Sequence, residues 1–557
     1  MAQMGASMDS TQSLRFPAGV APTAADDLVQ RLDQLNAIGA SLSAERDIDR
    51  LLEAILTAAK TITRADGGTL YRVTEEKSLR FEIVRTSSLK YYLGGSTGNP
   101  VPFYPIQLYK DGKPNQTMVA AQAALTGKTI NIADAYTAEG FDFTGTRAFD
   151  AKTGYRSKSF LTVPMRNHEG ETIGVLQLIN AVDPLNGEIV AFSASDQRLA
   201  ESLASQAAVA LANRMLINQL ESLFESFISL INGAIDEKSP YTGGHCQRVP
   251  VLTMMLAEAV NETTEGPLAD FHMTDKDRYE LKIAGLLHDC GKVTTPVHVV
   301  DKASKLETIF DRIQLIDTRF EVLKRDLEID SLRRRAAMGW METAEAEARL
   351  RDELRRLDED RKFLHACNIG SERMRDDDIA HVKRIAKYRW RDLSGHEADF
   401  LSADEVKNLT IRAGTLTEEE RKIINHHIVA TIRMLEALPW PKHLINVPEY
   451  AGGHHERMDG KGYPKGLTRE QMSVQARCMG IADIFEALTA KDRPYKKGKT
   501  LSESLEILGR MKQNQHIDPD LFDIFVRRKI YRRYAEMFLD KEQIDEVEES
   551  RIPGYKP

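Results

Sequence analysis

Cysteine is scarce in this chain, and neither a long apolar run nor a secretory signal is present. The 557 residues include four cysteines without a CxxC pair: Cys246, Cys290, Cys367 and Cys478. This pattern predicts free thiols in a reducing compartment rather than a disulfide framework. No apolar stretch reaches the roughly 18 residues of a membrane-spanning helix, and the N-terminus lacks the basic start and apolar core of a signal peptide. We therefore expect a cytoplasmic protein without a membrane span.

An excess of positive charge is also missing. The 83 acidic residues outnumber the 75 basic ones, and the net charge of -8 does not favour a nucleic-acid partner. A free nucleotide could still bind to a local basic cluster. Apolar residues make up 42% of the chain, and a chain of this length is expected to divide into about three or four folding units.

The N-terminal half predicts an α+β domain. Residues 1–28 are rich in Ala, Ser, Gln and Met and are expected to form a disordered tail. A helical pattern and a series of strand-like runs then predict the domain over residues 29–195. The runs cover residues 68–73, 79–86, 128–132, 159–165 and 172–180. We expect a signalling helix at residues 196–232, and its length favours pairing with a copy of itself in a homodimer.

The C-terminal half predicts helices almost throughout. We expect an all-α domain in two parts, residues 233–302 and 413–540, followed by a tail at 541–557. A helical insertion at 303–412 separates the two parts. Its first helix carries an apolar seam with steps of four and three, formed by Ile309, Ile313, Ile316, Phe320, Leu323 and Leu327. A second, charged helix carries Leu350, Leu354, Leu357 and Leu364. The seam pairs either with this second helix, as a coiled-coil-like hairpin, or with a second subunit.

Histidine and aspartate recur after apolar helical segments of the all-α domain. They are His245, the pair His288 and Asp289, the pair His426 and His427, the pair His454 and His455, and Asp483. Phosphodiester hydrolysis needs a nucleophile at neutral pH and neutralised phosphoryl oxygens, and two metals about 3.5–4 Å apart supply both. Imidazole and carboxylate ligands without cysteine suit Fe or Mn better than a structural zinc. Asp289 is suited to bridge two metals because one carboxylate has two oxygens. A helix can turn only one of His426 and His427 inward.

Two motifs of this domain resemble the signature of the HD-GYP family. They are His288-Asp289-x-Gly291-Lys292 and His454-His455-Glu456-x-x-Asp459-Gly460-x-Gly462-Tyr463-Pro464. The segment 482–489, followed by Arg493-Pro494-Tyr495-Lys496, resembles the next motif of the family. The resemblance implies an all-helical fold with two or three metal ions and hydrolysis of cyclic di-GMP to linear pGpG, to GMP or to both.

The resemblance also implies roles for individual residues. The metal ligands would be His245, His288, Asp289, His427, His454, His455 and Asp483. Asp289 would bridge the metals, and Lys292 would contact or protonate the leaving group. Arg493 and Lys496 would hold phosphate oxygens, because the planar guanidinium group of arginine and the ammonium group of lysine both bind phosphate. Gly462 and Tyr463 would contribute to substrate binding.

The chain departs from the family pattern in two places. Some members bind a third metal through a Glu one helical turn before the first His, but Tyr241 occupies that position here. We therefore expect two divalent metal ions. Glu237 lies eight residues before His245 and could substitute only with a different geometry. The second departure is the insertion at 303–412, where relatives usually have a short lid-like loop.

The N-terminal α+β domain resembles a GAF domain, in particular the cyclic-nucleotide-binding type. The resemblance rests on Phe149-Asp150-x-x-Thr153-Gly154-Tyr155, then Asn180, Phe192 and Asp196. It implies a pocket near Phe149, Asp150, Thr153 and Tyr155 for a cyclic nucleotide or another small ligand. Ala181 and Gln197 replace a Lys and a Glu of the family pattern, so the ligand stays open. The alternative is a dimerisation module without a ligand.

Three functions compete at this point. The leading hypothesis is a cyclic di-GMP phosphodiesterase regulated by the N-terminal domain through the long helix. The second is a signalling module that binds a nucleotide or a protein without turnover, and the complete set of histidines and aspartates argues against it. The third is a hydrolase of another cyclic dinucleotide, which the motifs do not exclude.

Overall fold

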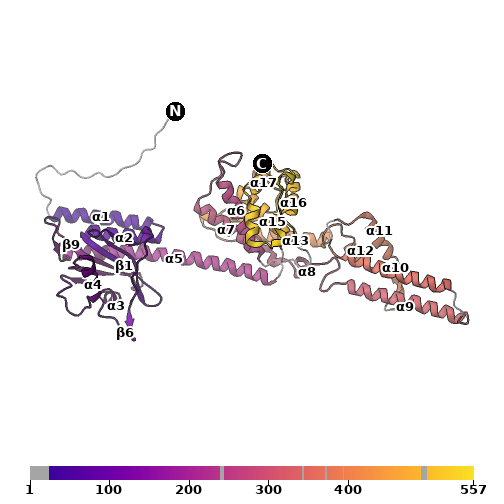
Figure 1. Cartoon of the computed structure of the whole chain (residues 1–557), viewed down its shortest axis with the longest axis horizontal. Coiled ribbons are helices and arrows are strands. Elements are labelled where there is room, and N and C mark those ends of the chain that lie inside the picture. Colours follow the sequence, from indigo (N-terminus) through magenta and orange to yellow (C-terminus); the bar gives the residue numbers. More distant parts are fainter. Residues whose placement is uncertain (1–23, 239–243, 341–343, 371–372, 393, 491–497) are drawn as a thin grey trace, which may run out of the picture. The chain divides into compact units, whose positions relative to one another are not determined.

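The computed structural model describes residues 24–238, 244–340, 344–370, 373–392, 394–490 and 498–557. The chain forms two compact units, Met1–Leu223 and Phe224–Pro557 (Figure 1). Most of the predicted tail at 1–28 lies outside the described residues, and so do Tyr241, Arg493 and Lys496. In the described part of the chain, no helix is both long enough and apolar enough to cross a membrane.

The first unit is built around an antiparallel sheet with the strand order β3-β2-β1-β9-β8-β7. Its strands are β1 (Ala65–Val73), β2 (Ser78–Thr86), β3 (Tyr91–Gly94), β4 (Ile106–Gln107), β7 (Ile130–Ile132), β8 (Phe160–Arg166), β9 (Thr172–Val182) and β10 (Ile189–Val190). A separate hairpin consists of β5 (Tyr109–Lys110) and β6 (Lys113–Pro114). The five predicted strands correspond to β1, β2, β7, β8 and β9. The other strands were not predicted because two to four residues carry no alternating pattern.

Helices cover both faces of this sheet (Figure 1). Helices α1 (Ala24–Ala44), α2 (Ile48–Thr63) and the start of α5 (Ala194–Lys238) share one core with Leu70 and Leu176. Helix α3 (Val119–Thr126) packs against the other face, where the neighbouring strand residues Tyr71 and Val175 point. This alternation is the two-residue period of a strand. The remaining helices of this unit are η1 (Gly95–Thr97) and α4 (Thr144–Thr153).

Helix α5 begins inside this domain rather than after it. Leu199, Leu203 and Leu211 are buried in the same core as α1 and α2. The boundary expected at residue 195 is therefore too early, because a helical period does not reveal which core a helix enters.

The second unit is a helical domain around a large apolar core. Its helices are α6 (His245–Asn261), α7 (Asp275–Leu287), η2 (Cys290–Thr294), α8 (Val297–Val300), α13 (Glu418–Glu436), η3 (Lys442–Leu444), α14 (Val447–Gly452), η4 (Arg469–Gln471), α15 (Val474–Thr489), α16 (Leu501–Gln513), α17 (Pro519–Arg527) and α18 (Ile530–Phe538). The last turns of α5 add Ile228 and Ile235 to the core. The tail expected at 541–557 is wrong: it forms η5 (Lys541–Gln543) and η6 (Glu549–Arg551), and Ile552 is buried in the same core.

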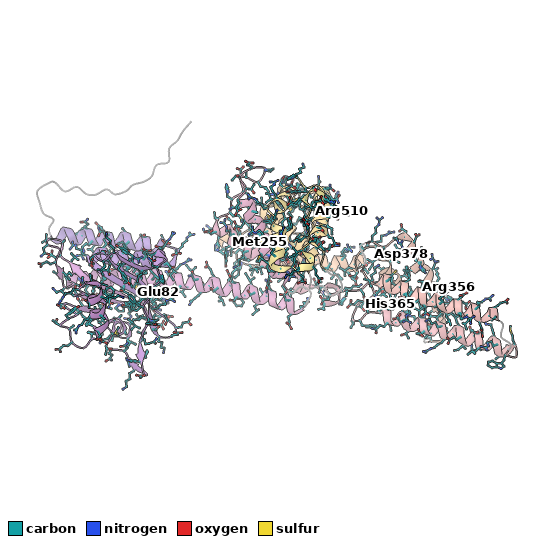
Figure 2. All side chains as sticks on the ribbon, in the orientation of Figure 1. Glu82, Met255, Arg356, His365, Asp378 and Arg510 are labelled. Carbon is teal, nitrogen blue, oxygen red and sulfur yellow. The ribbon has the colours of Figure 1, made fainter. Side chains whose placement is uncertain are left out.

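The insertion has a small core of its own. It consists of α9 (Ile313–Ala337), α10 (Ala344–Asn368), α11 (Asp376–Ile385), β11 (Arg389–Arg391), β12 (Glu397–Asp399) and α12 (Ala403–Leu409). Ile316 and Phe320 of α9 are buried with Leu357 and Leu364 of α10, so the seam pairs with the following helix of the same chain. Figure 2 labels His365 on α10. Its Nε2 lies 2.8 Å from Oδ1 of Asp317 on α9.

Two expectations about the insertion are wrong. Ile309 lies before α9 and is 96% exposed, so it does not belong to the seam. The strands β11 and β12 were not expected, because three residues each carry no detectable alternation.

Candidate metal centre

Five elements of the helical domain bring the seven expected histidines and aspartates together. His245 begins α6, His288 and Asp289 follow α7, His427 lies in α13, His454 and His455 follow α14, and Asp483 lies in α15. Within the described residues, three overlapping groups of these side chains could each hold a metal ion, with ligand atoms within 4.8 Å of one another. His427 is buried and His426 is exposed, so the helix turns His427 inward, as expected.

Asp289 lies at the middle of this cluster. Its Oδ2 is 3.1 Å from Nε2 of His245 and 3.4 Å from Nε2 of His288. Its Oδ1 is 3.2 Å from Nε2 of His427. The two oxygens therefore face two different groups of imidazoles, which is the arrangement that a carboxylate bridging two metals requires.

The remaining expected ligands complete two groups around this carboxylate. Asp483 Oδ1 is 3.2 Å from His245 Nε2, on the Oδ2 side of Asp289. His455 Nε2 is 3.2 Å from His427 Nε2, on the Oδ1 side. His454 Nε2 is buried and has no hydrogen-bond partner among the described residues. A buried ring nitrogen without a partner is costly unless a ligand satisfies it, so the nitrogen and oxygen donors present fit divalent metal ions.

Backbone carbonyls orient three of the imidazoles. The Nδ1 atom of His288 donates to Gly285 O at 2.6 Å, and that of His454 donates to Ala451 O at 2.7 Å. His427 makes the same contact with the carbonyl three residues before it, at 2.5 Å. These bonds leave each Nε2 as the inward acceptor, which is how proteins usually orient histidine for a metal.

His245 is oriented by a carboxylate instead. Its Nδ1 lies 2.5 Å from Oε2 of Glu486, and Glu486 also accepts from Nε of Arg248 at 2.8 Å. Glu486 was not among the expected site residues. The available signal was its position three residues after Asp483, which places both on one face of α15.

Burial and neighbouring charge set the protonation states of the cluster. Burial lowers the pKa of His288 to about 4 and also lowers the pKa of His454, so both imidazoles are neutral. Burial opposes ionisation of Asp289, but the charge of Lys292 outweighs it and holds the pKa of Asp289 well below its usual value. Neutral imidazoles and ionised carboxylates are the forms that bind metal. His245 differs, because Asp289, Asp483 and Glu486 overcome burial and raise its pKa.

The turn after Asp289 packs tightly against α13. A Cβ atom on Gly291 would lie 2.0 Å from the His427 carbonyl oxygen, so only glycine fits there. The Gly291 N–H donates to Thr431 Oγ1 at 2.9 Å. Lys292 Nζ lies 2.5 Å from Asp289 Oδ2, which places the lysine beside the cluster.

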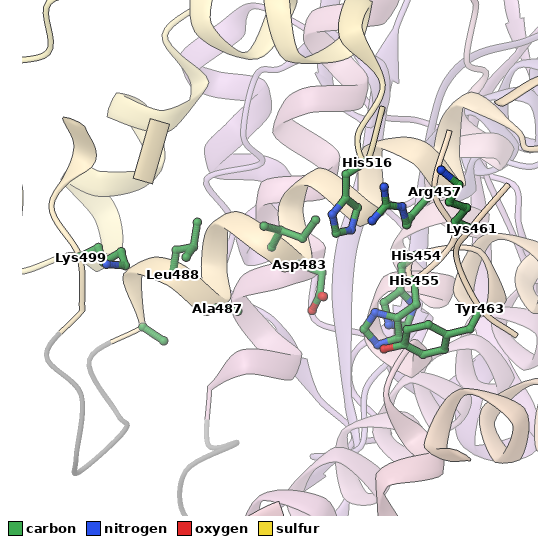
Figure 3. A pocket seen from close by; sticks show the side chains of 12 residues that line it. His454, His455, Arg457, Lys461, Tyr463, Asp483, Ala487, Leu488, Lys499 and His516 are labelled. Atoms are coloured by element: carbon green, nitrogen blue, oxygen red, sulfur yellow. The ribbon is translucent and has the colours of Figure 1, made fainter. Parts of the chain in front are cut away.

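The loop at 456–467 forms one wall of the site. Glu456 is buried and accepts from Leu467 N at 2.9 Å. Tyr463 stacks on His455, with ring centroids 4.9 Å apart. A Cβ atom on Gly462 would lie 2.4 Å from Glu456 Cα, so this loop also requires glycine. A cavity of about 480 Å³ opens beside His454, His455 and Asp483 (Figure 3).

Family comparisons match three segments of the chain. The GAF domain family matches residues 47–211, and HD domain families match residues 242–361 and 403–521. The chain carries a GAF domain and an HD domain.

Three similar proteins with named activities each match about a fifth to a quarter of this chain. A cyclic di-GMP phosphodiesterase of Pseudomonas aeruginosa is 38% identical over 116 residues, which are 21% of this chain and 27% of that protein. A 3'3'-cGAMP-specific phosphodiesterase of Vibrio cholerae is 42% identical over 135 residues, which are 24% and 30% of the two chains. A cyclic di-GMP phosphodiesterase of Thermotoga maritima is 30% identical over 130 residues, which are 22% and 34%. The chain thus spans about a third or less of the length of these relatives.

Two solved structures are similar to about a third of this chain. A GAF domain/HD domain protein from Geobacter sulfurreducens is 14% identical, and the match covers 31% of this chain and 98% of that one with a TM-score of 0.22. A GAF domain from an Acinetobacter phosphoenolpyruvate-protein phosphotransferase is 16% identical, covers 34% and 96% of the two chains, and has a TM-score of 0.26.

In the GAF domain, the residues expected near a ligand pocket mostly bond to the domain itself. Asp150 is buried and accepts from Tyr136 Oη at 2.9 Å and Ser157 N at 2.8 Å. Tyr155 Oη donates to Asp66 at 2.7 Å. Phe149 packs edge-on against Tyr91, and Thr153 is exposed with its hydroxyl on the Phe149 carbonyl. These contacts give Asp150 and Tyr155 a supporting role within the GAF domain.

Glu486 generates a prediction for metal affinity. Replacing Glu486 by Leu removes the partner of His245 Nδ1, so metal affinity is expected to fall about 10–100-fold, as for other residues that orient ligands. Glu486→Gln keeps a hydrogen-bond acceptor for His245 and is expected to lose less metal affinity than Glu486→Leu. Competition with a chromogenic chelator measures the dissociation constant. Glu506→Leu, an exposed change on α16, serves as the control, and unchanged affinity in Glu486→Leu contradicts the assigned role.

Proposed function

We propose that this chain hydrolyses the phosphodiester bonds of cyclic di-GMP, to linear pGpG, to GMP or to both, in a metal-dependent reaction. The observation that carries the proposal is the position of Asp289, whose two oxygens lie between His245 and His288 on one side and His427 on the other. The names of the P. aeruginosa and T. maritima relatives support the same substrate.

Two divalent ions, Fe or Mn, are the proposed cofactors. Such a pair, when bound, acidifies a water and neutralises phosphoryl charge. Asp289 and the six expected residues around it are the proposed ligands, and Asp289 would offer one carboxylate oxygen to each ion. Glu237, which could have added a ligand, is exposed.

The chain's own side chains have separate tasks. Lys292 stays protonated because Asp289 and Asp483 outweigh its burial and raise its pKa. A charged Lys292 can donate a hydrogen bond to the scissile phosphate or a proton to the leaving oxygen. Gly462 and Tyr463 are proposed to contribute to substrate binding, because their loop forms one wall of the site and Tyr463 stacks on His455. Arg493 and Lys496 are proposed phosphate contacts on the strength of the HD-GYP resemblance alone, since they lie outside the described residues.

Another cyclic dinucleotide is the second candidate substrate. The V. cholerae relatives that are named 3'3'-cGAMP-specific phosphodiesterases favour it. A module that binds without turnover is less well supported, because every expected metal-ligand side chain converges on the cluster.

Helix α5 is proposed to join two copies of the chain. From Val209 onward, large apolar side chains on α5 repeat in steps of seven, four and three and are exposed: Val209, Leu216, Leu220, Leu223, Phe227 and Leu230. An exposed apolar stripe with this period is the seam of a coiled coil. A second copy of α5 is therefore the proposed partner, and the chain is a homodimer.

The same helix offers a route for regulation by the GAF domain. Lys238, the last residue of α5, donates to the carbonyl oxygens of Lys292, at 3.3 Å, and of Val293. Movement of α5 would thus reach the turn that carries Asp289 and Lys292. A cyclic nucleotide or another small ligand at the GAF domain is the proposed signal.

The catalytic proposal is tested with Asp289→Ala. Loss of the bridging carboxylate is expected to abolish hydrolysis of cyclic di-GMP and to reduce the metal content of the protein. Products of the Mn-loaded protein are resolved by chromatography over time, with 3'3'-cGAMP as a parallel substrate, and metal is counted by elemental analysis. Asp275→Ala, at the exposed start of α7, is the matched control. Hydrolysis at the parent rate by Asp289→Ala would show that Asp289 is not the bridge.

The dimer proposal predicts the effect of charge in the α5 seam. The double substitution Leu220→Glu and Phe227→Glu places like charges across the seam and is expected to yield a monomer. Sedimentation velocity of the full chain measures the change. Ser229→Glu, at an exposed position away from the seam on the same helix, is expected to stay dimeric. A dimer that persists in the double variant excludes this seam as the interface.

A further inference from the structure

A patch of positive charge lies where α17 ends and α18 begins. Its five side chains are all exposed, and we call them the basic patch: Arg527, Arg528, Lys529, Arg532 and Arg533. The chain as a whole carries a net charge of -8, so the patch is opposite in sign to the molecule that bears it. Like charges this close repel one another, and a partner that supplies negative charge would relieve the repulsion.

Bonds within the protein offset little of this charge. Arg532 Nε lies 3.3 Å from Oε1 of Glu536, an exposed pair on α18. Arg527 Nη2 donates to the Lys556 carbonyl at 3.4 Å, a contact that leaves the arginine charge unbalanced. The other three side chains of the basic patch form no ion pair with any residue that the structure describes.

The carboxylates of the preceding helix are engaged elsewhere. Asp520 pairs with Arg469, and Asp523 pairs with Lys512 at 2.5 Å. Neither is therefore available to the basic patch, although Asp523 lies only one helical turn before Arg527.

The charges of the basic patch are also badly placed for the stability of α18. Arg532 lies in the first turn of the helix and Arg533 directly after it, where the aligned peptide dipoles already present partial positive charge. That turn contains no acidic residue, and no side chain caps it. Charges that oppose local stability are expected where a function requires them.

The exposed face of α18 adds an apolar side chain to the charge. Met537 follows Arg533 by one helical turn and is 58% exposed. The aromatic residues Tyr531 and Tyr534 are buried on the opposite face. They cannot stack on nucleobases, which is how proteins usually hold single-stranded nucleic acid. Exposed cations beside one apolar side chain suit a surface of phosphate headgroups over hydrocarbon better.

We propose that the basic patch binds the anionic headgroups of a lipid membrane surface. Clusters of about four to eight Lys or Arg residues on an amphipathic helix favour anionic lipids, and Met537 enters between the headgroups. The inference goes beyond the proposed function and does not depend on it, because the patch includes none of the proposed metal ligands.

Co-sedimentation of the full chain with lipid vesicles tests the proposal. The parent is expected to bind vesicles of equal parts phosphatidylglycerol and phosphatidylcholine, and not vesicles of phosphatidylcholine alone. The triple variant Arg528→Gln, Lys529→Asn and Arg533→Gln is expected to lower the partition coefficient about a hundredfold, because each basic residue near an anionic surface contributes about fivefold. Asparagine is chosen at 529 because Lys529 has a positive φ of 52°, which asparagine tolerates.

A second triple variant is the matched control. Arg325→Gln, Arg333→Gln and Arg349→Gln remove the same charge from exposed positions on α9 and α10, and this variant is expected to bind like the parent. Equal binding by the parent and the patch variant overturns the proposal, and so does an equal loss in the control. Parent binding to phosphatidylcholine alone, or to duplex DNA but not to anionic vesicles, overturns it as well.

Discussion

The helical domain is organised around one buried charge, the carboxylate of Asp289, which is 1% exposed. Removing a carboxylate from water is expensive unless charged or polar partners surround it. Here the ammonium group of Lys292 pairs with the carboxylate, and divalent ions held between Asp289 and the Nε2 atoms of His245, His288 and His427 would provide the remaining partners. These side chains lie in α6, at the end of α7, in η2 and in α13. The helices must therefore meet at one point, and divalent ions at that point satisfy the same demand.

The positions of the imidazoles depend on the backbone as much as on the side chains. His288, His427 and His454 each bond to a carbonyl three residues earlier, so local helical geometry aims the opposite ring nitrogen inward. Gly291 allows the turn after Asp289 to touch α13, where any side chain would collide with the His427 carbonyl. Small shifts of these helices would separate the ligand atoms.

Ordered motifs made much of this arrangement predictable. The ligand set with His245, Asp289 and Asp483, and the choice of His427 over His426, followed from the resemblance to the HD-GYP motifs. The apolar seam predicted the hairpin of α9 and α10 as one of two possible pairings. Glu486 was not predicted as a site residue because its role depends on a contact with His245, which is far from it in the sequence. Ile309 was wrongly assigned to the seam because the apolar spacing extends beyond the N-terminal end of α9. The packing of residues 541–557 was missed because isolated residues such as Ile552 carry no period.

Asp289 is proposed to bridge two metal ions, and anomalous diffraction at the Mn absorption edge, from crystals of the Mn-loaded protein, measures this arrangement. Two peaks about 3.5–4 Å apart are expected, one beside His245 and His288 and the other beside His427, with the Asp289 carboxylate between them. A single peak, a third peak, or two peaks that the Asp289 carboxylate does not join would contradict it.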